Sequence, residues 1–395
     1  MSGSTGSFET WWDDLAPIGR TASGGYRRFA WTREDATLRE WFVGTAQGLG
    51  LDVVTDRAGN LWAWWGHPDR DGPGVVVGSH LDSVPEGGAF DGPLGVVSSL
   101  AAVETLRGNG FTPSVPISVV CFGDEEGARF GIACAGSRLL TGALDADRAR
   151  RLTDADGVSM AEAVRAAGRD PEQLGADPQA LARVGQFVEL HVEQGRALVD
   201  TGDAVGVGAA IWPHGRWRFD LAGRADHAGT TRLADRNDPM LALAALVTGA
   251  RSAAERHDAL ATVGKVIVQP NGVNAIPSLV QAWLDARGPD EDAVRSLVAD
   301  LAAEHGEAER ESWTPRTPFD IDLTRRLSRT LGDVPVIETG AGHDAGVLAE
   351  AGVPTSMLFV RNPTGVSHSP HEHAELDDCL AGVRALTRVL EDLAS

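Results

Sequence analysis

The first third of the chain alternates between short apolar runs and longer segments of helical length. The runs at 74–80 (GVVVGSH) and 116–122 (PISVVCF) are rich in β-branched residues, which is typical of strands buried on both faces of a sheet. The segment 92–110 between them has the length of a helix and ends in a glycine. This strand–helix–strand order predicts a mostly parallel sheet covered by helices, in which ligands bind beyond the carboxyl ends of the strands.

The same alternation continues further along the chain. A third apolar strand is expected within 185–195 (GQFVELHVEQG). Ser159 and Glu162 are spaced for a capping box at the start of a short helix. After about Thr324 the α/β pattern returns, and it ends in a helix at 377–394.

The pattern changes in the middle of the chain. From about Trp212 the order is strand, long helix, strand, strand and helix, which predicts an antiparallel sheet with two helices on one face. We interpret residues 212–324 as an α+β domain inserted into a larger α/β catalytic domain made of 1–211 and 325–395. The length of 395 residues agrees with two domains, because a single core stops growing before that size.

Charge and composition exclude several classes of function. The chain has 35 basic and 56 acidic residues, and a net charge of −21 disfavours nucleic acid and anionic lipid as partners. Its three cysteines are widely separated, which disfavours a disulfide framework and a thiolate metal site. The N-terminal segment lacks the basic flank and apolar run of a secretory signal, and no stretch reaches the length of a membrane span. We therefore expect a cytoplasmic protein.

Three of the predicted strands end in residues that bind metals. The acidic and histidine side chains at these ends are His80, Asp82, Asp91, Asp124, Glu125, Glu126, Glu189, His191 and Glu193. The segment GVSHSPHEHAE near the C-terminus adds His368, His371 and His373. An isolated histidine or glutamate pair is commonly structural, but three strand ends of the same kind indicate a metal site. Histidine and carboxylate without thiolate suit zinc, manganese or cobalt, and there are enough ligands here for two ions that share a carboxylate and a water.

The spacing of the residues at and just beyond the end of the first strand has a physical explanation. His80 and Asp82 are two residues apart, so on extended backbone they point the same way. His80 can then bind a metal while Asp82 accepts the other imidazole N–H. Gly87 and Gly88 allow the loop to turn back and bring Asp91 alongside.

The adjacent pair Glu125 and Glu126 follows the second strand. On extended backbone the two side chains would point to opposite sides, so one can bind metal while the other faces the bound water as a general base. A metal-bound water gives up its proton readily, because the cation lowers the pKa of the water to about 7.

These residues lie in motifs that resemble a known family. The stretches GSHLDSVPEGGAFDGPLGV, DEEGARFG, ELHVEQG, ADHAGTTR, NAIPS, GAGHDA and SHSPHE occur in the order seen in two-metal amidohydrolases of the aminoacylase-like metallopeptidase clan. That group includes N-carbamoyl-L-amino-acid hydrolases, allantoate amidohydrolase, ureidoglycolate amidohydrolase and β-ureidopropionase. The resemblance runs from about residue 20 to the end of the chain.

The resemblance implies roles for individual residues at the metal site. It implies two divalent cations, zinc or manganese with cobalt possible, and five protein ligands, which are His80, Asp91, Glu126, His191 and His368. Asp91 would bridge the two ions. Glu125 would be the general base, and Asp82 would be the partner of His80.

The resemblance also implies a substrate site and a dimer. Gln194, His227, Asn274 and Arg287 would bind a small anionic substrate. The inserted domain would act as a lid and form a homodimer, and His227 would stabilise the oxyanion in the neighbouring subunit's site. Asn274 and Arg287 would hold the substrate carboxylate, which agrees with the bidentate geometry of arginine.

The chain departs from its relatives near the expected substrate. Trp212 and His214 stand in AIWPHGRW where related enzymes often have Gln, and Arg232 follows HAGTT where proline is common. These differences leave the metal chemistry unchanged but leave the exact substrate open, and we count His214 among the candidate substrate residues. His371 and His373 are treated as bystanders.

The predicted activity is metal-dependent hydrolysis of a C–N amide bond in a ureido- or carbamoyl-substituted carboxylic acid. Allantoate is the first predicted substrate, because WPHGRW together with ADHAGTTR is similar to proteins grouped with allantoate amidohydrolases. N-carbamoyl-L-amino acids and N-formyl or other N-acyl amino acids are the alternatives. A dipeptidase or aminopeptidase on the same metal core and a metal-free binding protein are hypotheses of other classes. A serine hydrolase is disfavoured because no G-x-S-x-G motif is present.

Overall fold

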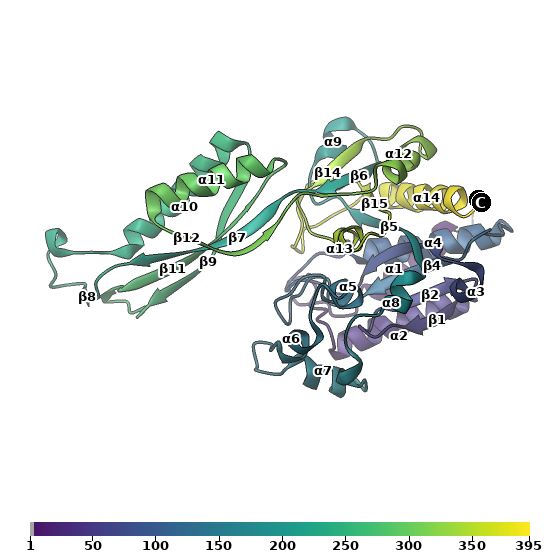
Figure 1. Ribbon diagram of the computed structural model, residues 1–395, viewed down its shortest axis with the longest axis horizontal. Helices are drawn as coiled ribbons and strands as arrows, with labels where there is room; N and C mark the ends of the chain where they lie inside the picture. Colours follow the sequence, from purple (N-terminus) through teal and green to yellow (C-terminus); the bar gives the residue numbers. More distant parts are fainter. Residues whose placement is uncertain (1–3) are drawn as a thin grey trace. The chain divides into compact units, whose positions relative to one another are not determined.

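A computed structural model describes residues 4–395, and these divide into two compact units (Figure 1). The larger unit comprises the chain up to Ala210 together with Pro318–Ser395, and the smaller unit is Ile211–Thr317. The smaller unit ends before position 324, where the sequence pattern placed its boundary. The reason is that helix α12 (Ile321–Thr330) contacts elements of the larger unit and buries Leu323 and Leu327 in its core.

A nine-stranded sheet forms the centre of the larger unit. Eight of its strands follow the order β1-β2-β4-β3-β5-β15-β6-β13, and β14 pairs with β6. The strands are β1 (Asp52–Thr55), β2 (Leu61–Trp65), β3 (Gly74–His80), β4 (Ile117–Phe122), β5 (Val184–Val192), β6 (Val205–Ile211), β13 (Thr317–Pro318), β14 (Val336–Thr339) and β15 (Thr355–Val360). The central pairs β4–β3, β3–β5 and β5–β15 are parallel. The predicted, mostly parallel sheet is thereby confirmed.

Helices cover this sheet and complete its core. The larger unit contains α1 (Ser4–Leu15), α2 (Arg33–Gly48), α3 (Pro68–Asp71), α4 (Pro93–Gly108), α9 (Ala197–Thr201), α13 (Asp344–Glu350) and α14 (Leu376–Leu393) besides α12. Helix α4 packs against β3, β5, α1 and α14. It is buried along most of its length because small and aliphatic residues occupy nearly every face. This explains why its sequence lacks the amphipathic periodicity of a surface helix.

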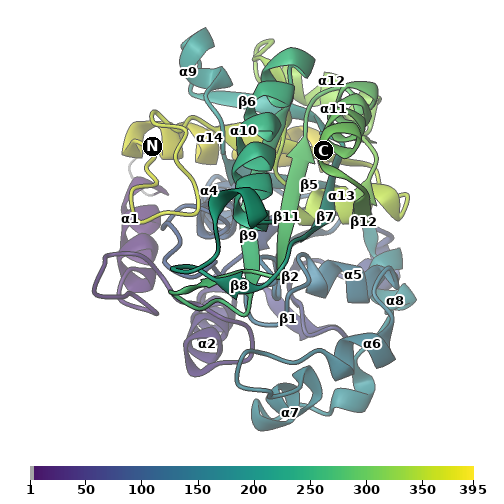
Figure 2. The same cartoon turned by 90° about the vertical axis from the view of Figure 1, so that its left-hand side faces the viewer.

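A group of short helices forms a second, smaller core in the same unit (Figure 2). The helices of this core are α5 (Ala135–Thr141), α6 (Ala146–Arg151) and α7 (Met160–Ala166), while α8 (Pro178–Ala182) packs against α5, and a 3₁₀ turn lies at Pro171–Gln173. The capping box predicted for α7 is present: the Ser159 hydroxyl accepts the N–H of Glu162, and the Glu162 carboxylate accepts the N–H of Ser159 at 2.8 Å.

The smaller unit is a four-stranded antiparallel sheet with two helices on one face (Figures 1 and 2). Its strands run in the order β12-β7-β11-β9, and its elements are β7 (His214–Ala222), β9 (Leu260–Gln269), β11 (Leu279–Arg287), β12 (Ala308–Thr314), α10 (Pro239–His257) and α11 (Glu291–His305). Alternate residues of β11 are fully buried, and they form one core with both helices. This is the α+β arrangement that the sequence predicts.

Some elements had no counterpart in the sequence pattern. Helix α1 and strands β6 and β12 were not predicted, and β8 (Asp226–His227) pairs with β10 (Ala275–Ile276) in a separate two-stranded ladder. A 3₁₀ turn lies at Leu233–Asp235. Within residues 4–395, no helix combines the length and the apolar character needed to cross a membrane.

Candidate metal centre

The carboxyl ends of two neighbouring parallel strands bring two histidines to the same carboxylate. His80 ends β3, His191 lies one residue before the end of β5, and Asp91 lies in the loop between β3 and α4. Nε2 of His80 and Nε2 of His191 lie 3.5 and 3.1 Å from the same oxygen, Asp91 Oδ1. All three side chains are buried. We call these three residues the His80 group.

The other oxygen of Asp91 faces a second set of ligands. Nε2 of His368 lies 3.4 Å from Asp91 Oδ2 and 3.5 Å from Glu126 Oε2. We call Asp91, Glu126 and His368 the His368 group. Asp91 therefore lies between two clusters of metal-binding side chains, each of which brings its ligand atoms within 4.8 Å of one another.

The two buried histidines could bind a cation through Nε2. Nδ1 of His80 lies 3.1 Å from the carbonyl oxygen of Asp82, and Nδ1 of His191 lies 2.9 Å from the carbonyl oxygen of Val192. A carbonyl oxygen can only accept, so in the neutral rings the proton is on Nδ1 and the lone pair on Nε2. Both Nε2 atoms are buried and face Asp91 Oδ1, the carboxylate oxygen that a bound cation would share with them. The donor set of histidine and carboxylate fits zinc, manganese or cobalt.

The protonation of the centre reflects how many acidic groups are buried together. Burial, and then the charge of Asp91, raises the pKa of Glu126 to about 7. The hydrogen bond to Asp91 raises the pKa of His368 to about 9. Burial of Glu125, followed by the repulsion of Asp344 and Glu126, raises its pKa well above the usual range. A divalent cation would offset this repulsion, because it favours the ionised form of every carboxylate near it.

Asp82 has partners besides the imidazole that the spacing predicts. The N–H of Glu125 donates to Asp82 Oδ1 (3.1 Å), and the N–H of Glu126 donates to Asp82 Oδ2 (3.0 Å). Nδ1 of His80 lies 3.5 Å from the predicted partner, Asp82 Oδ1, and 3.1 Å from the backbone carbonyl oxygen of Asp82. The main hydrogen bonds of the Asp82 carboxylate thus fix the loop that carries both glutamates.

The two glutamates lie beyond the end of β4, where the chain is no longer extended. Asp124 before them has a left-handed φ of 55°, which turns the backbone at that point. Glu125 Oε2 lies 3.8 Å from His80 Nε2, whereas Glu126 faces His368. The thiol of Cys134 donates to Glu125 Oε1 at 3.1 Å. The two side chains therefore diverge toward different ligand groups.

Gln194 also lies at the metal centre. Its Nε2 donates to Asp91 Oδ2 (2.9 Å) and to the hydroxyl of Ser367 (3.1 Å). Its Oε1 is buried and, within the described part of the chain, has no hydrogen-bond partner. This predicted substrate residue therefore orients Asp91 and keeps an acceptor available for a ligand.

His343 and Glu189 both lie close to His191, and the sequence did not indicate that these two residues lie together. His343 is buried, and its ring centroid lies 4.5 Å from that of His191. With His191 and Glu189 it forms a third group of potential ligands. Both oxygens of Glu189 already accept hydrogen bonds, from Ser79 Oγ at 2.8 Å and from the N–H of Ala345 at 2.9 Å. The signal that could have identified His343 is its place in GAGHDA, just after a strand that joins the same sheet.

The remaining predicted residues belong to the smaller unit, where they form two pairs. Residue His227 of β8 pairs with Ala275 of β10, the residue after Asn274, and both His227 and Asn274 are exposed. His214 and Arg287 face each other across β7 and β11. The guanidinium of Arg287 is ion-paired with Asp285 at 2.6 Å.

Three other histidine or acidic candidates lie outside the two ligand groups. Glu193 accepts the N–H groups of Ala197 and Leu198 at the start of α9. His371 is exposed, and His373 pairs with Glu375 at 3.3 Å. None of the three is among the groups that could hold a metal in the described chain.

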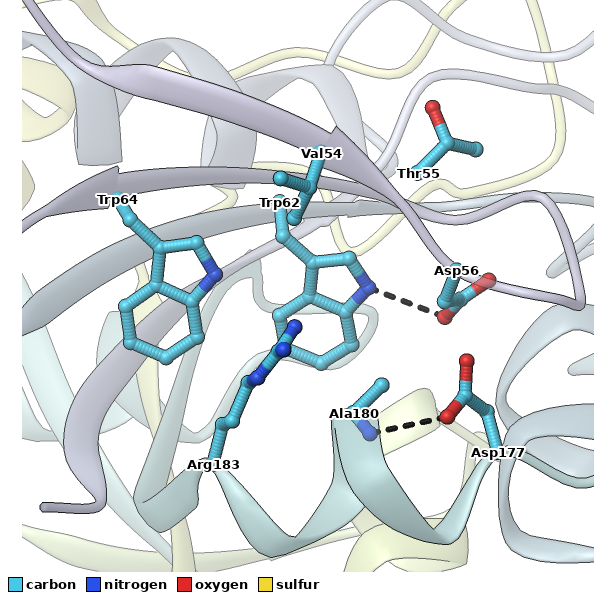
Figure 3. Close-up of a pocket in the computed structure, with 8 residues that line it drawn as sticks. All are labelled: Val54, Thr55, Asp56, Trp62, Trp64, Asp177, Ala180 and Arg183. Atoms are coloured by element: carbon cyan, nitrogen blue, oxygen red, sulfur yellow. Dashed lines mark hydrogen bonds between the residues drawn. The ribbon is translucent and has the colours of Figure 1, made fainter. Parts of the chain in front are cut away.

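A small pocket elsewhere in the larger unit differs from the metal centre (Figure 3). It has a volume of about 60 Å³ and is lined by residues that include Trp62, Trp64, Asp56 and Arg183. Trp62 Nε1 donates a hydrogen bond to Asp56 Oδ2 at 3.0 Å, drawn as a dashed line in Figure 3. A cavity of this size holds only a few water molecules, so we interpret it as a packing feature of β1, β2 and α8.

Comparison with known proteins identifies relatives over almost the whole chain. Residues 76–392 match peptidase family M20/M25/M40. The chain is 38% identical to an N-carbamoyl-L-amino acid amidohydrolase from Geobacillus stearothermophilus and 31% identical to the allantoate amidohydrolase of Escherichia coli, in each case over 96% of both chains. The crystal structure of an amidase of the hydantoinase/carbamoylase family from Burkholderia vietnamiensis superposes with a TM-score of 0.85 at 31% identity, covering 98% of this chain and 97% of the other.

Proposed function

This chain belongs to peptidase family M20/M25/M40 and is an amidohydrolase that cleaves carbon–nitrogen bonds other than peptide bonds, and from that premise we propose a substrate class and a role for each site residue. We propose that it hydrolyses the ureido group of an N-carbamoylated amino-acid-like carboxylate. Addition of water to the carbonyl breaks the bond to the substituted nitrogen and releases an amine and carbamate, which decomposes to carbon dioxide and ammonia. The position of Asp91 between the His80 and His368 groups carries this proposal.

The proposed ligands are His80, Asp91, Glu126, His191 and His368. Divalent cations bound by these residues would activate a water and polarise the substrate carbonyl. Glu125 takes the proton of the attacking water and returns it to the leaving nitrogen. Two hydrogen bonds hold Glu125 in place for this proton transfer, because Asp82 accepts its backbone N–H and Cys134 donates to its Oε1. Its other oxygen, Oε2, is the one that lies 3.8 Å from His80.

His227 is the proposed oxyanion donor. Its Nδ1 accepts the N–H of Gly229 at 3.0 Å, so in the neutral ring the proton is on Nε2. The exposed side chain therefore presents a donor to the developing oxyanion of a bound substrate. Asn274 directly precedes the strand that pairs with β8 and is proposed, with Arg287 and His214, to contact the rest of the substrate. Asp285 orients the guanidinium of Arg287 for a carboxylate.

The substrate within this class is proposed from the relatives and from the sequence motifs. Sequence motifs favour allantoate, whereas the 38% identity to the Geobacillus enzyme against 31% to the Escherichia coli enzyme supports N-carbamoyl-L-amino acids. We therefore propose N-carbamoyl-L-amino acids first and allantoate second. Both present the same ureido group and carboxylate to the residues named above.

We also propose that the chain forms a homodimer through the smaller unit. Strand β9 lies at the edge of its sheet and exposes Leu260, Val266 and Ile267. Helix α10, which packs against β9, exposes Leu241 and Val247. An apolar edge strand and an apolar helix side together fit a second copy that adds its own β9.

One assay panel tests the substrate proposal. Purified protein is incubated with zinc or manganese and with N-carbamoyl-L-amino acids, N-formyl amino acids, allantoate, ureidoglycolate and a dipeptide, and ammonia and free amine are quantified. We expect turnover of ureido acids and none of the dipeptide. Faster hydrolysis of the dipeptide than of every ureido acid would overturn the proposal.

A further inference from the structure

A buried carboxylate that has no role in the proposed reaction joins two loops of the metal centre. Glu372 is 5% exposed. Its Oε1 accepts the backbone N–H groups of Phe90 at 2.8 Å and of Asp91 at 2.9 Å. Its Oε2 accepts the hydroxyl of Ser367 at 3.1 Å. One side chain thus holds the backbone of the Asp91 loop and the residue that precedes His368.

The local sequence places Glu372 at this position. The chain turns at Ser369–Glu372, where the N–H of Glu372 donates to the carbonyl of Ser369 at 3.0 Å and Pro370 occupies the second position. On the opposite loop, Gly88 leaves room for the carboxylate. A Cβ at Gly88 would lie 2.3 Å from Glu372 Oε1, so only glycine permits this approach.

Both loops carry ligands of the His368 group, and His368 needs external support. Its backbone has a left-handed φ of 54°, and its side chain is 54% exposed. Few packing contacts can therefore fix this histidine. A left-handed conformation in a residue other than glycine persists where the surroundings enforce it. The hydrogen bond that the Ser367 hydroxyl donates to Glu372 supplies such a constraint one residue away from His368.

We propose that Glu372 is a positioning residue that sets the spacing between Asp91 and His368 and so preorganises their side chains for a divalent cation. This inference rests on the proposed function, which assigns those two residues as ligands. A carboxylate that accepts two amide N–H groups makes strong, charge-assisted hydrogen bonds. Outer partners of metal ligands commonly contribute 10- to 100-fold to metal affinity.

Metal binding by matched variants tests the proposal. Wild-type protein, Glu372→Ala, Glu372→Gln and the control Glu375→Ala are treated with a chelator and titrated with Mn²⁺ by calorimetry. Glu375 is exposed and lies three positions along the same segment. We expect Glu372→Ala to bind Mn²⁺ about 10- to 100-fold more weakly and the control to match wild type. Glutamine keeps an acceptor for both N–H groups, so Glu372→Gln is expected to stay within about threefold of wild type.

A substitution at Gly88, on the loop that contains Asp91, disturbs the same contact. Gly88→Ala should displace the Glu372 carboxylate and weaken Mn²⁺ binding as Glu372→Ala does. The double variant should be no weaker than Glu372→Ala alone, because residues that act through one contact are not additive. Thermal unfolding of each metal-free variant shows which of them are folded, and Gly88→Ala, which disturbs the same contact, keeps the test open if Glu372→Ala unfolds.

The outcomes separate this inference from the proposed function. If wild-type protein binds no Mn²⁺ in this titration, the assignment of the ligands is wrong. If wild type binds and a folded Glu372→Ala variant binds equally well, only the positioning role is wrong. Additive losses in the double variant, or weaker binding by Glu372→Gln than by Glu372→Ala, would also contradict it.

Discussion

The carboxylate of Asp82 accepts the backbone N–H of Glu125 at 3.1 Å, although the two residues are 43 positions apart. This contact ties the end of β3 to the loop that follows β4. The proposed base is therefore held through its backbone by a residue just beyond the end of the neighbouring strand, and Asp82 should act on catalysis without touching the substrate.

Replacing Asp82 tests this relationship. Asp82→Ala removes the acceptors of both glutamate N–H groups and should lower kcat or metal affinity by about 10- to 100-fold, because Glu126 on the same loop is a proposed ligand. Asp82→Asn keeps one acceptor and should lose less. Steady-state kinetics and elemental analysis of the same samples provide the measurement, and Asp14→Asn, an exposed substitution, is the control. Equal activity of Asp82→Ala and wild type would contradict the role.

Substitutions of the two adjacent glutamates should have different effects on metal binding and activity. Glu125→Gln removes the proposed base but none of the five proposed ligands, so we expect metal content to stay unchanged and kcat to fall about 10²- to 10⁴-fold. Glu126→Gln should lower metal affinity as well as activity, because Glu126 faces His368 at 3.5 Å. Metal analysis after dialysis distinguishes the two variants, and full activity of Glu125→Gln would remove it from the mechanism.

Metal removal should lower stability as well as activity. A cation that binds only the folded chain stabilises it by about 2.7 kcal/mol when its concentration is 100 times Kd. We expect urea unfolding of chelated protein to shift by about this amount when Mn²⁺ is restored at that concentration. The variant His80→Ala should respond less, because it lacks one of the proposed ligands. An equal response in the variant would argue for a different binding site.

Acid should destabilise the smaller unit through His214. Burial, and then the charge of Arg287 on the neighbouring strand, lowers the pKa of His214 below its usual 6.5. Above pH 6.5 His214 is neutral in both the folded and the unfolded chain, so it does not affect the free energy of unfolding. Below pH 6.5 the unfolded chain binds a proton that the folded chain does not, so the free energy of unfolding decreases as the pH falls. One proton contributes at most about 1.4 kcal/mol per pH unit.

The comparison of wild type with His214→Gln isolates this contribution. Urea midpoints are measured between pH 8 and pH 5.5, and we expect the wild type to lose more stability over that range than the variant. Parallel curves for the two proteins would show that His214 does not carry the effect.

The exposed edge of the smaller unit should mediate self-association. The double substitution Val266→Lys and Ile267→Lys places two charges on β9, where both side chains are 40% exposed. We expect light scattering to report twice the chain mass of 41.6 kDa for wild type and a single chain mass for the variant. Val54→Lys is the matched control, because Val54 is 41% exposed on β1 at the edge of the other sheet. A monomeric wild type would refute the dimer.

Much of the fold could be predicted because its signals are local. The run of seven buried residues in β3 reads as a strand covered on both faces, and the Ser159–Glu162 capping box needs only three residues of spacing. Strand β12 was missed for the opposite reason. Strand β12 is mostly exposed and polar, so it has no apolar alternation and is recognised only by its pairing with β7.

The sequence by itself determined which residues are candidates for the metal centre, because histidine and carboxylate at the ends of apolar strands can be recognised from residue type and order. The tertiary structure alone decided which partner each one meets. Asp82 holds the glutamate loop, Gln194 holds Asp91, and Glu372 bonds to Asp91 across 281 positions of sequence. Such contacts depend on how distant loops converge at one edge of the sheet, and no local pattern encodes that convergence.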